Sequence, residues 1–155
     1  MKLNKNDKAI KNKTTKYINN IIDDVEKPYI YRNKKYSNYP FSIIKKSTNK
    51  KLGKKVLKGN KKDFKMYTLT LVERSTCTDE CEHWSTCYGN NMMFAHRIDH
   101  SNQNVLQKYI VRDLTNLKGK KVLIRLHVLG DFFNVNYVKF WKFALLMFPN
   151  VSAFG

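Results

Sequence analysis

From residue 66 onward the sequence alternates between strand-like and helix-like patterns, and this alternation constrains the fold more than any other feature. The segment MYTLTLVE at 66–73 is rich in the β-branched and aromatic residues that favour strands. KVLIRLHV at 121–128 is the clearest strand pattern of the chain. The other predicted elements are helices over 90–100 and 104–117, a helix that Asn134 caps and Pro149 ends, and a strand over 151–155. Strands that alternate with helices predict parallel strands joined by right-handed crossovers.

This order predicts an α/β fold. Residues 66–155 are expected to form a βαβαβ domain, a partial (truncated) parallel β/α barrel-like sheet of about three βα units. Residues 1–65 are expected to form a basic Lys/Asn-rich extension, with a helix over about 7–25 and short hairpin-like strands after it. Three strands leave the last edge of a sheet open, which predicts that the domain is incomplete at its C-terminus. The helix after Asn134 is expected to pack on the sheet through its apolar residues at helical spacing, Val138, Trp141, Leu145 and Phe148.

The positive charge of the chain is concentrated in its first part. Residues 1–65 contain 20 Lys and Arg against 5 Asp and Glu, whereas residues 66–155 contain 10 against 7. Lysine clusters attract polyanions, so residues 1–65 predict a weak affinity for nucleic acid. The same Lys/Asn-rich composition also arises in AT-rich genomes without selection for binding, and this alternative stays open. No run is long and apolar enough for a membrane span or a signal peptide, which predicts a cytoplasmic protein without membrane contact.

All three cysteines of the chain lie within eleven residues, in the stretch CTDECEHWSTCYGN at 77–90. A clustered, odd number of cysteines in a cytoplasmic protein indicates metal or redox chemistry instead of a disulfide framework. Three thiolates on one loop are able to ligate an iron–sulfur cluster or a zinc ion. Zinc in a structural site also requires a fourth ligand, for which His83 is the candidate within the loop. Free thiols are the third interpretation.

A second group of candidate site residues lies in and after the strand at 121–128. Alternation along this strand places Arg125 and His127 on one face, although parallel strands are normally apolar on both faces. The pair predicts a polar site for a carboxylate or phosphate, and the alternatives are a solvated face or an ion pair between Arg125 and Glu73. Because functional loops follow the carboxyl ends of parallel strands, Gly130 and Asp131 are expected on the same sheet edge as the cysteines. Asp131 is expected either to contact a cofactor amine or to cap the next helix.

Two segments resemble a bacteriophage family called gene product eighty-eight. They are LTLVERSTCTDECEHWSTCYGNN and IRLHVLGDFFNVNYVKFWKFALLMFPNVSAFG, and the resemblance covers about residues 47–155. It implies a phage protein expressed in the host cytoplasm and gives no specific activity. The matching positions are Cys77, Cys81, Cys87, Tyr88, Arg125, His127, Gly130, Asp131, Phe132 and Trp141.

The cysteine loop and its place after the first strand are also similar to those of radical S-adenosylmethionine (radical SAM) enzymes. In those enzymes three cysteines in a C-x3-C-x2-C pattern hold a [4Fe–4S] cluster, whereas this chain has C-x3-C-x5-C. The resemblance implies a small-molecule or nucleotide substrate and a radical SAM-like enzyme. It also implies metal ligands Cys77, Cys81 and Cys87, cofactor contacts Tyr88, Gly130 and Asp131, and catalytic residues Arg125 and His127. The alternative is a non-enzymatic zinc-binding phage protein with a basic nucleic-acid-binding arm.

Overall fold

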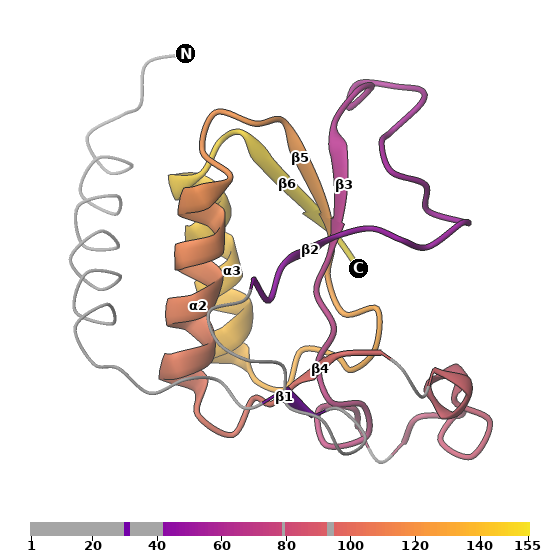
Figure 1. The fold of residues 1–155 in the computed structure, drawn as a ribbon. Coiled ribbons are helices and arrows are strands. Elements are labelled where there is room, and N and C mark those ends of the chain that lie inside the picture. The colour runs from indigo at the N-terminus through magenta and orange to yellow at the C-terminus, as the bar shows by residue number, and fades with distance from the viewer. Residues whose placement is uncertain (1–29, 32–41, 79, 93–94) are drawn as a thin grey trace.

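A four-stranded mixed sheet forms the centre of the computed structural model, which describes residues 30–31, 42–78, 80–92 and 95–155 (Figure 1). The strands β3, β5 and β6 are parallel and lie next to one another, and β2 pairs antiparallel with β3. A separate two-stranded sheet joins β1 to β4. The predicted α/β class and the parallel order of three strands are therefore confirmed. The strands are β1 (Ile30–Tyr31), β2 (Lys45–Lys46), β3 (Lys65–Thr68), β4 (Arg97–Ile98), β5 (Val122–Arg125) and β6 (Val151–Phe154).

Two α-helices, α2 (Gln103–Asn116) and α3 (Val135–Met147), lie side by side next to the sheet in Figure 1. Each begins at an asparagine whose side-chain oxygen accepts a hydrogen bond from the first turn. Asn102 accepts from the backbone N–H of Val105 at 3.1 Å, and Asn134 accepts from that of Tyr137 at 2.8 Å. The helix predicted over 104–117 and the cap at Asn134 are confirmed. Neither described helix is long and apolar enough to cross a membrane.

The prediction of a helix over residues 90–100 is wrong. In the described residues of this segment, the 3₁₀ helix η1 (Tyr88–Asn91) ends and the strand β4 follows. The backbone N–H of Ile98 donates to the carbonyl of Thr70 at 3.0 Å, and its own carbonyl accepts from Val72 at 3.2 Å. Because these partners belong to the chain after β3, extended pairing replaces the local helix at Ile98, whose side chain is buried.

The hydrophobic core lies between the sheet and the two helices, and it includes part of the basic first segment. Ile43 and Ile44, next to β2, are buried in the same core as the sheet residues. On α3 the predicted packing of Trp141 is confirmed, but Val138 is 45% exposed. Leu145 and Phe148 are partly buried and pack against the core, as predicted. The fully buried residues of α3 lie three or four positions apart, the spacing of a helical stripe, and are Tyr137, Phe140, Trp141 and Ala144. The helix predicted over 7–25 lies outside the described residues.

A buried carboxylate on α2 fixes the start of this core. The side chain of Asp113 is 1% exposed, and its Oδ2 atom accepts hydrogen bonds from Ile43 N at 2.6 Å and Ile44 N at 2.9 Å. Ser42 donates to the same oxygen, and Arg112 donates to the other oxygen. Buried backbone N–H groups require acceptors, so Asp113 is the residue that allows the chain to enter the core ahead of β2.

Candidate functional site

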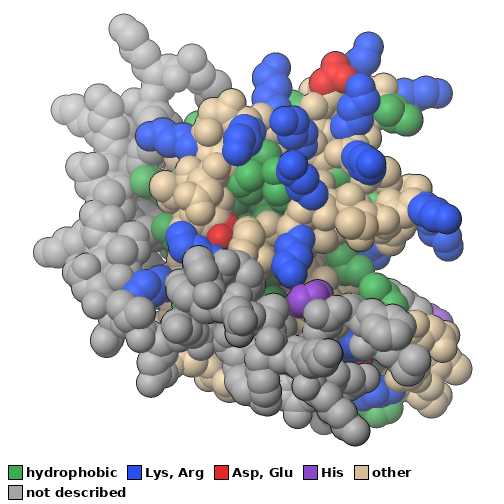
Figure 2. Space-filling model, in the orientation of Figure 1, with side chains coloured by type: hydrophobic (Ala, Val, Ile, Leu, Met, Phe, Trp, Pro, Cys, Tyr) green, Lys and Arg blue, Asp and Glu red, His purple; other side chains and the backbone are tan. Residues whose placement is uncertain are grey.

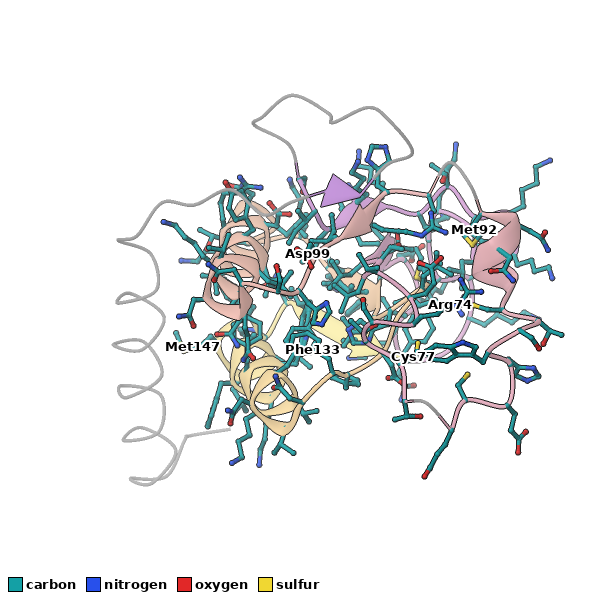
Figure 3. The ribbon with its side chains drawn as sticks, turned by 90° about the horizontal axis from the view of Figure 1, so that it is seen from below. Arg74, Cys77, Met92, Asp99, Phe133 and Met147 are labelled. Atoms are coloured by element: carbon teal, nitrogen blue, oxygen red, sulfur yellow. The ribbon has the colours of Figure 1, made fainter. Side chains whose placement is uncertain are left out.

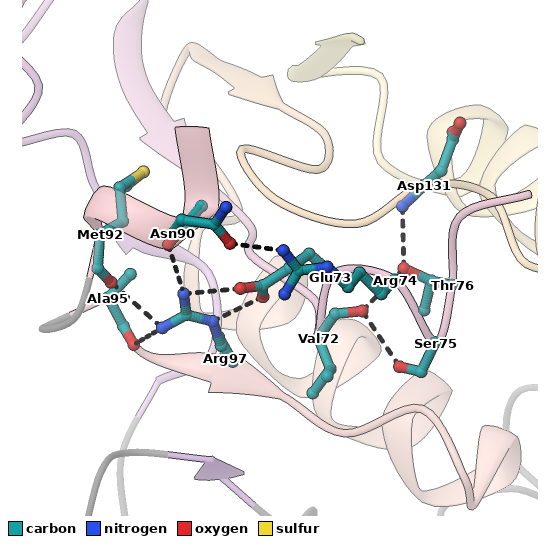
Figure 4. Close-up of polar contacts among 11 residues, drawn as sticks. Val72, Glu73, Arg74, Ser75, Thr76, Asn90, Met92, Ala95, Arg97 and Asp131 are labelled. Atoms are coloured by element: carbon teal, nitrogen blue, oxygen red, sulfur yellow. Dashed lines mark hydrogen bonds and ion pairs between the residues drawn. The ribbon is translucent and has the colours of Figure 1, made fainter. Parts of the chain in front are cut away.

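The loops that follow β3 and β5 meet at one edge of the sheet, as expected from the sequence. The backbone N–H of Leu71 donates to the carbonyl of Leu129 at 3.0 Å, which extends the pairing of the two strands beyond their ends. Further along, the N–H of Asp131 donates to Oγ1 of Thr76 at 3.0 Å, and this hydroxyl donates in turn to the carbonyl of Val72 (Figure 4). Gly130 and Asp131 therefore lie directly against the residue that precedes Cys77.

Gly130 is a position of close approach between the two loops. Its φ angle is +79°, a left-handed conformation that glycine adopts without steric cost. A Cβ atom at this position would lie 2.5 Å from Oγ1 of Thr76 and 2.8 Å from Cβ of Leu71. Asp131 is exposed, and its carboxylate accepts from the backbone N–H of Phe132 at 2.7 Å. Asn134, not Asp131, caps α3, so the capping interpretation of Asp131 is wrong.

The three cysteines lie on an irregular segment, residues 77–87, which we call the cysteine loop. Cys77, Cys81 and Cys87 are partly exposed free thiols. Figure 3, in which Cys77 is labelled, shows this loop on the other side of the molecule from α2 and α3. Among the residues that the structure describes, no three His, Cys, Asp or Glu side chains gather closely enough to hold a metal ion. The side chain of Tyr88 lies outside the described part.

An ion pair that the sequence did not suggest fixes the base of the cysteine loop. Arg97 binds the carboxylate of Glu73 through Nε and Nη2, and the two side chains are 14% and 11% exposed (Figure 4). The same guanidinium donates to the carbonyls of Gly89, Met92 and Ala95, so it holds η1 and the residues just after it against Glu73. Burial alone would raise the pKa of Glu73, but the hydrogen bond and the charge of Arg97 outweigh it and lower this pKa. The predicted ion pair between Glu73 and Arg125 is therefore replaced by Glu73–Arg97.

The strand predicted over 121–128 ends earlier, at Arg125, and this changes the surroundings of His127. The φ angle of His127 is +56°, so strand alternation does not continue to it from the partly exposed Arg125. The imidazole packs edge-on against Phe132, with ring centroids 4.6 Å apart, and its Nε2 atom lies 3.3 Å from the hydroxyl of Tyr137. Burial lowers the pKa of His127 to about 4, against the opposing charge of Asp131, so the ring is neutral at pH 7.

A second surface feature is a lysine-rich area, which we call the lysine face. Figure 2 shows Lys and Arg side chains spread over one side of the molecule, in the orientation in which β2 and β3 lie in front. The backbone N–H of Lys65 donates to the carbonyl of Lys121 at 2.9 Å. The pairing of β3 with β5 therefore brings the lysines of the turn at 118–121 next to those of the segment 42–65. This addition is not visible from charge counts along the sequence. We use the name lysine face for the lysines of residues 42–65 and 118–121, which are Lys45, Lys46, Lys50, Lys51, Lys54, Lys55, Lys58, Lys61, Lys62, Lys65, Lys118, Lys120 and Lys121.

Acidic side chains are scarce on the lysine face. Asp63 is the one acid within 42–65, and its carboxylate lies 3.6 Å from Nζ of Lys55. Exposed acids occur instead on the cysteine loop, at Glu80 and Glu82, beyond the carboxyl ends of the strands. Most of the lysine face thus lies near the start of β3, whereas Lys45 and Lys46 pair with its last residues and the acidic cysteine loop follows beyond them.

The chain matches no model of a known protein family, no curated protein and no solved structure.

Proposed function

We propose that the protein binds nucleic acid through the phosphate backbone, using the lysine face. The observation that carries this proposal is the concentration of lysines on one folded surface, where ten of the residues from 42 to 65 are lysine and one is acidic. Lysine ammonium groups neutralise phosphates and release condensed counterions, which provides affinity without reading the bases. The face contains no arginine, the residue that most often reads guanine, so the binding is independent of sequence.

The fold supports this proposal because it holds the lysines together. Lys55 forms an antiparallel bridge with Lys65, and Lys65 lies beside the 118–121 turn, so these positive charges cannot separate as they would in an extended tail. Repulsion between such neighbours is relieved when a polyanion binds. An AT-rich genome would explain a high lysine content. It would not explain why the exposed acids Glu80 and Glu82 lie on the cysteine loop and not among the lysines.

Charge reversal on the lysine face is expected to weaken this binding. The double variant Lys58→Glu/Lys62→Glu changes two exposed side chains and should lower the affinity for a fluorescent 20-nucleotide single strand by about tenfold or more at low salt. The slope of log affinity against log salt should also become shallower by about two. The matched control Lys139→Glu/Lys142→Glu makes the same change of charge on α3, away from the lysine face. Equal losses in both variants, measured by fluorescence anisotropy, would refute a localised face.

A metal centre on the cysteine loop is a second candidate function, and the contact between Thr76 and Asp131 favours it. This contact brings the cysteine loop to the carboxyl ends of adjacent parallel strands, where α/β proteins place cofactors. We propose Cys77, Cys81 and Cys87 as ligands of a [4Fe–4S] cluster, with zinc as the alternative. Because the described conformation keeps the three thiols apart, binding requires the loop to close.

If a cluster is bound, further roles follow for the residues around it. A cluster with bound S-adenosylmethionine supplies radical chemistry, for which Gly130 and Asp131 would contact the cofactor and Arg125 and His127 the substrate. Under the same proposal, β3, β5 and β6 belong to a β/α barrel. The protein would then come from a bacteriophage and act in the host cytoplasm.

Metal analysis tests the second proposal directly. After anaerobic reconstitution with iron and sulfide, the protein is expected to hold about four irons, in keeping with the cluster type, and replacement of any one cysteine by alanine should remove most of them. His83→Ala is the control, because it affects a Cys3His zinc site but not a three-thiolate cluster. Retention of the same metal content after Cys87→Ala, or no iron and no zinc in the native protein, would contradict a metal centre on this loop.

A further inference from the structure

A cavity of about 450 Å³ lies beside β2, between the end of β3 and the segment that leads into β4. Its volume falls within the range of small-molecule sites, roughly 300 to 1,000 Å³. Two members of the lysine face, Lys45 and Lys46, line it, so the cavity opens within the surface proposed for nucleic acid. The lining residues are Ile43, Lys45, Lys46, Thr48, Asn49, Thr68, Thr70, Met92, Ala95, His96, Ile98 and Val128.

The lining combines an apolar side with a polar, cationic side. Ile43, Ile98 and Val128 are buried core residues that present aliphatic surface to the cavity. Polar character comes from two lysines, Lys45 and Lys46, and from the hydroxyl and amide residues Thr48, Asn49, Thr68 and Thr70 in the same lining. An apolar surface suits a flat heteroaromatic ring, and ammonium and hydroxyl groups suit a phosphate. One nucleotide carries both of these groups.

We propose that this cavity accepts one nucleotide unit of a single strand bound on the lysine face. The base lies against the aliphatic side formed by Ile43, Ile98 and Val128, and the adjoining phosphate lies at Lys45 and Lys46. This inference rests on the proposed nucleic-acid binding and adds a preference for single strands, because a paired and stacked base in a duplex cannot enter a cavity. Duplexes then bind only through the lysine face.

Binding of adenosine monophosphate to the full-length protein, measured by calorimetry, tests the cavity separately from the lysine face. Ala95→Leu should fill part of the cavity and weaken this binding about tenfold, whereas Ala95→Ser, which keeps the volume, should leave it unchanged. The backbone of Ala95 supplies its hydrogen bonds to Met92 and Arg97, so the side chain is replaceable. Lys46→Ala should weaken adenosine monophosphate binding but not adenosine binding, and it provides an independent variant at an exposed position.

The outcomes separate the two proposals. An oligonucleotide that binds wild type and Ala95→Leu equally, with no measurable binding of adenosine monophosphate, overturns the cavity and leaves the lysine face intact. Binding of adenosine monophosphate without any binding of oligonucleotides overturns the lysine face. An equal affinity for single-stranded and duplex oligonucleotides of the same length also counts against the cavity.

Discussion

Asp113→Ala is expected to lower the free energy of unfolding by about 3–5 kcal/mol, the cost of breaking a buried, hydrogen-bonded charge network. The substitution leaves the buried backbone N–H groups of Ile43 and Ile44 without their acceptor and removes the ion pair with Arg112. Domains of this size are stable by only about 5–15 kcal/mol, so the loss is a large fraction of the total. Urea denaturation followed by circular dichroism measures it.

Asp63→Ala is the matched control for this experiment. Its carboxylate is 65% exposed and forms a surface ion pair with Lys55, so the expected loss is about 1–2 kcal/mol, mostly the strain that alanine meets at the left-handed backbone of this position. Asp113→Asn should fall between the two, because its amide oxygen still accepts from Ile43 and Ile44 but no longer forms an ion pair with Arg112. If Asp113→Ala destabilises the protein no more than Asp63→Ala, the carboxylate does not connect α2 to the segment ahead of β2.

Gly130→Ala is expected to cost about 3 kcal/mol of stability. A left-handed backbone costs a non-glycine residue about 1–2 kcal/mol, and overpacking adds about 1–3 kcal/mol because the new methyl group would collide with Thr76 and Leu71. The collision also forces the loop after β5 away from the base of the cysteine loop. The measurement is the midpoint of chemical denaturation.

Gly119→Ala separates the two contributions. Gly119 has a φ angle of +80°, almost the same as that of Gly130, but a Cβ atom there would meet nothing within 4 Å. It should therefore cost only the backbone strain of about 1–2 kcal/mol. The difference between the two variants gives the energy of the close approach between the loops, and equal losses would mean that the loops do not touch at Gly130.

The features that could be predicted from the sequence are those encoded locally. The helix at α2 follows from apolar residues at helical spacing, and the start of α3 follows from the capping side chain of Asn134. Strand β5 and the loops at its carboxyl end follow from a short apolar run and the glycine after it. Each of these signals lies within a few residues of the structure that it determines.

The features that could not be predicted depend on partners far along the chain. β4 replaces the expected helix because Ile98 pairs with the chain beyond β3. This pairing also brings Arg97 next to Glu73, so Glu73 forms its ion pair with Arg97 and not with Arg125. The cavity has walls from β2, β3 and the segment before β4, so no single stretch of sequence contains its pattern. The turn of the backbone at His127 has only a weak local signal, since histidine adopts a positive φ angle more often than most residues but much less readily than glycine.

Within the described residues, the lysines near the start of β3 and the acids of the cysteine loop form a local separation of charge. If the protein binds nucleic acid as proposed, this separation favours approaches in which the lysine face meets the polyanion and Glu80 and Glu82 point away. Orientation during diffusion raises the rate of productive encounters, and added salt removes this advantage within a Debye length of about 8–10 Å. On the proposed nucleic-acid binding, the folded arrangement of the charges would affect the rate of association as well as the affinity.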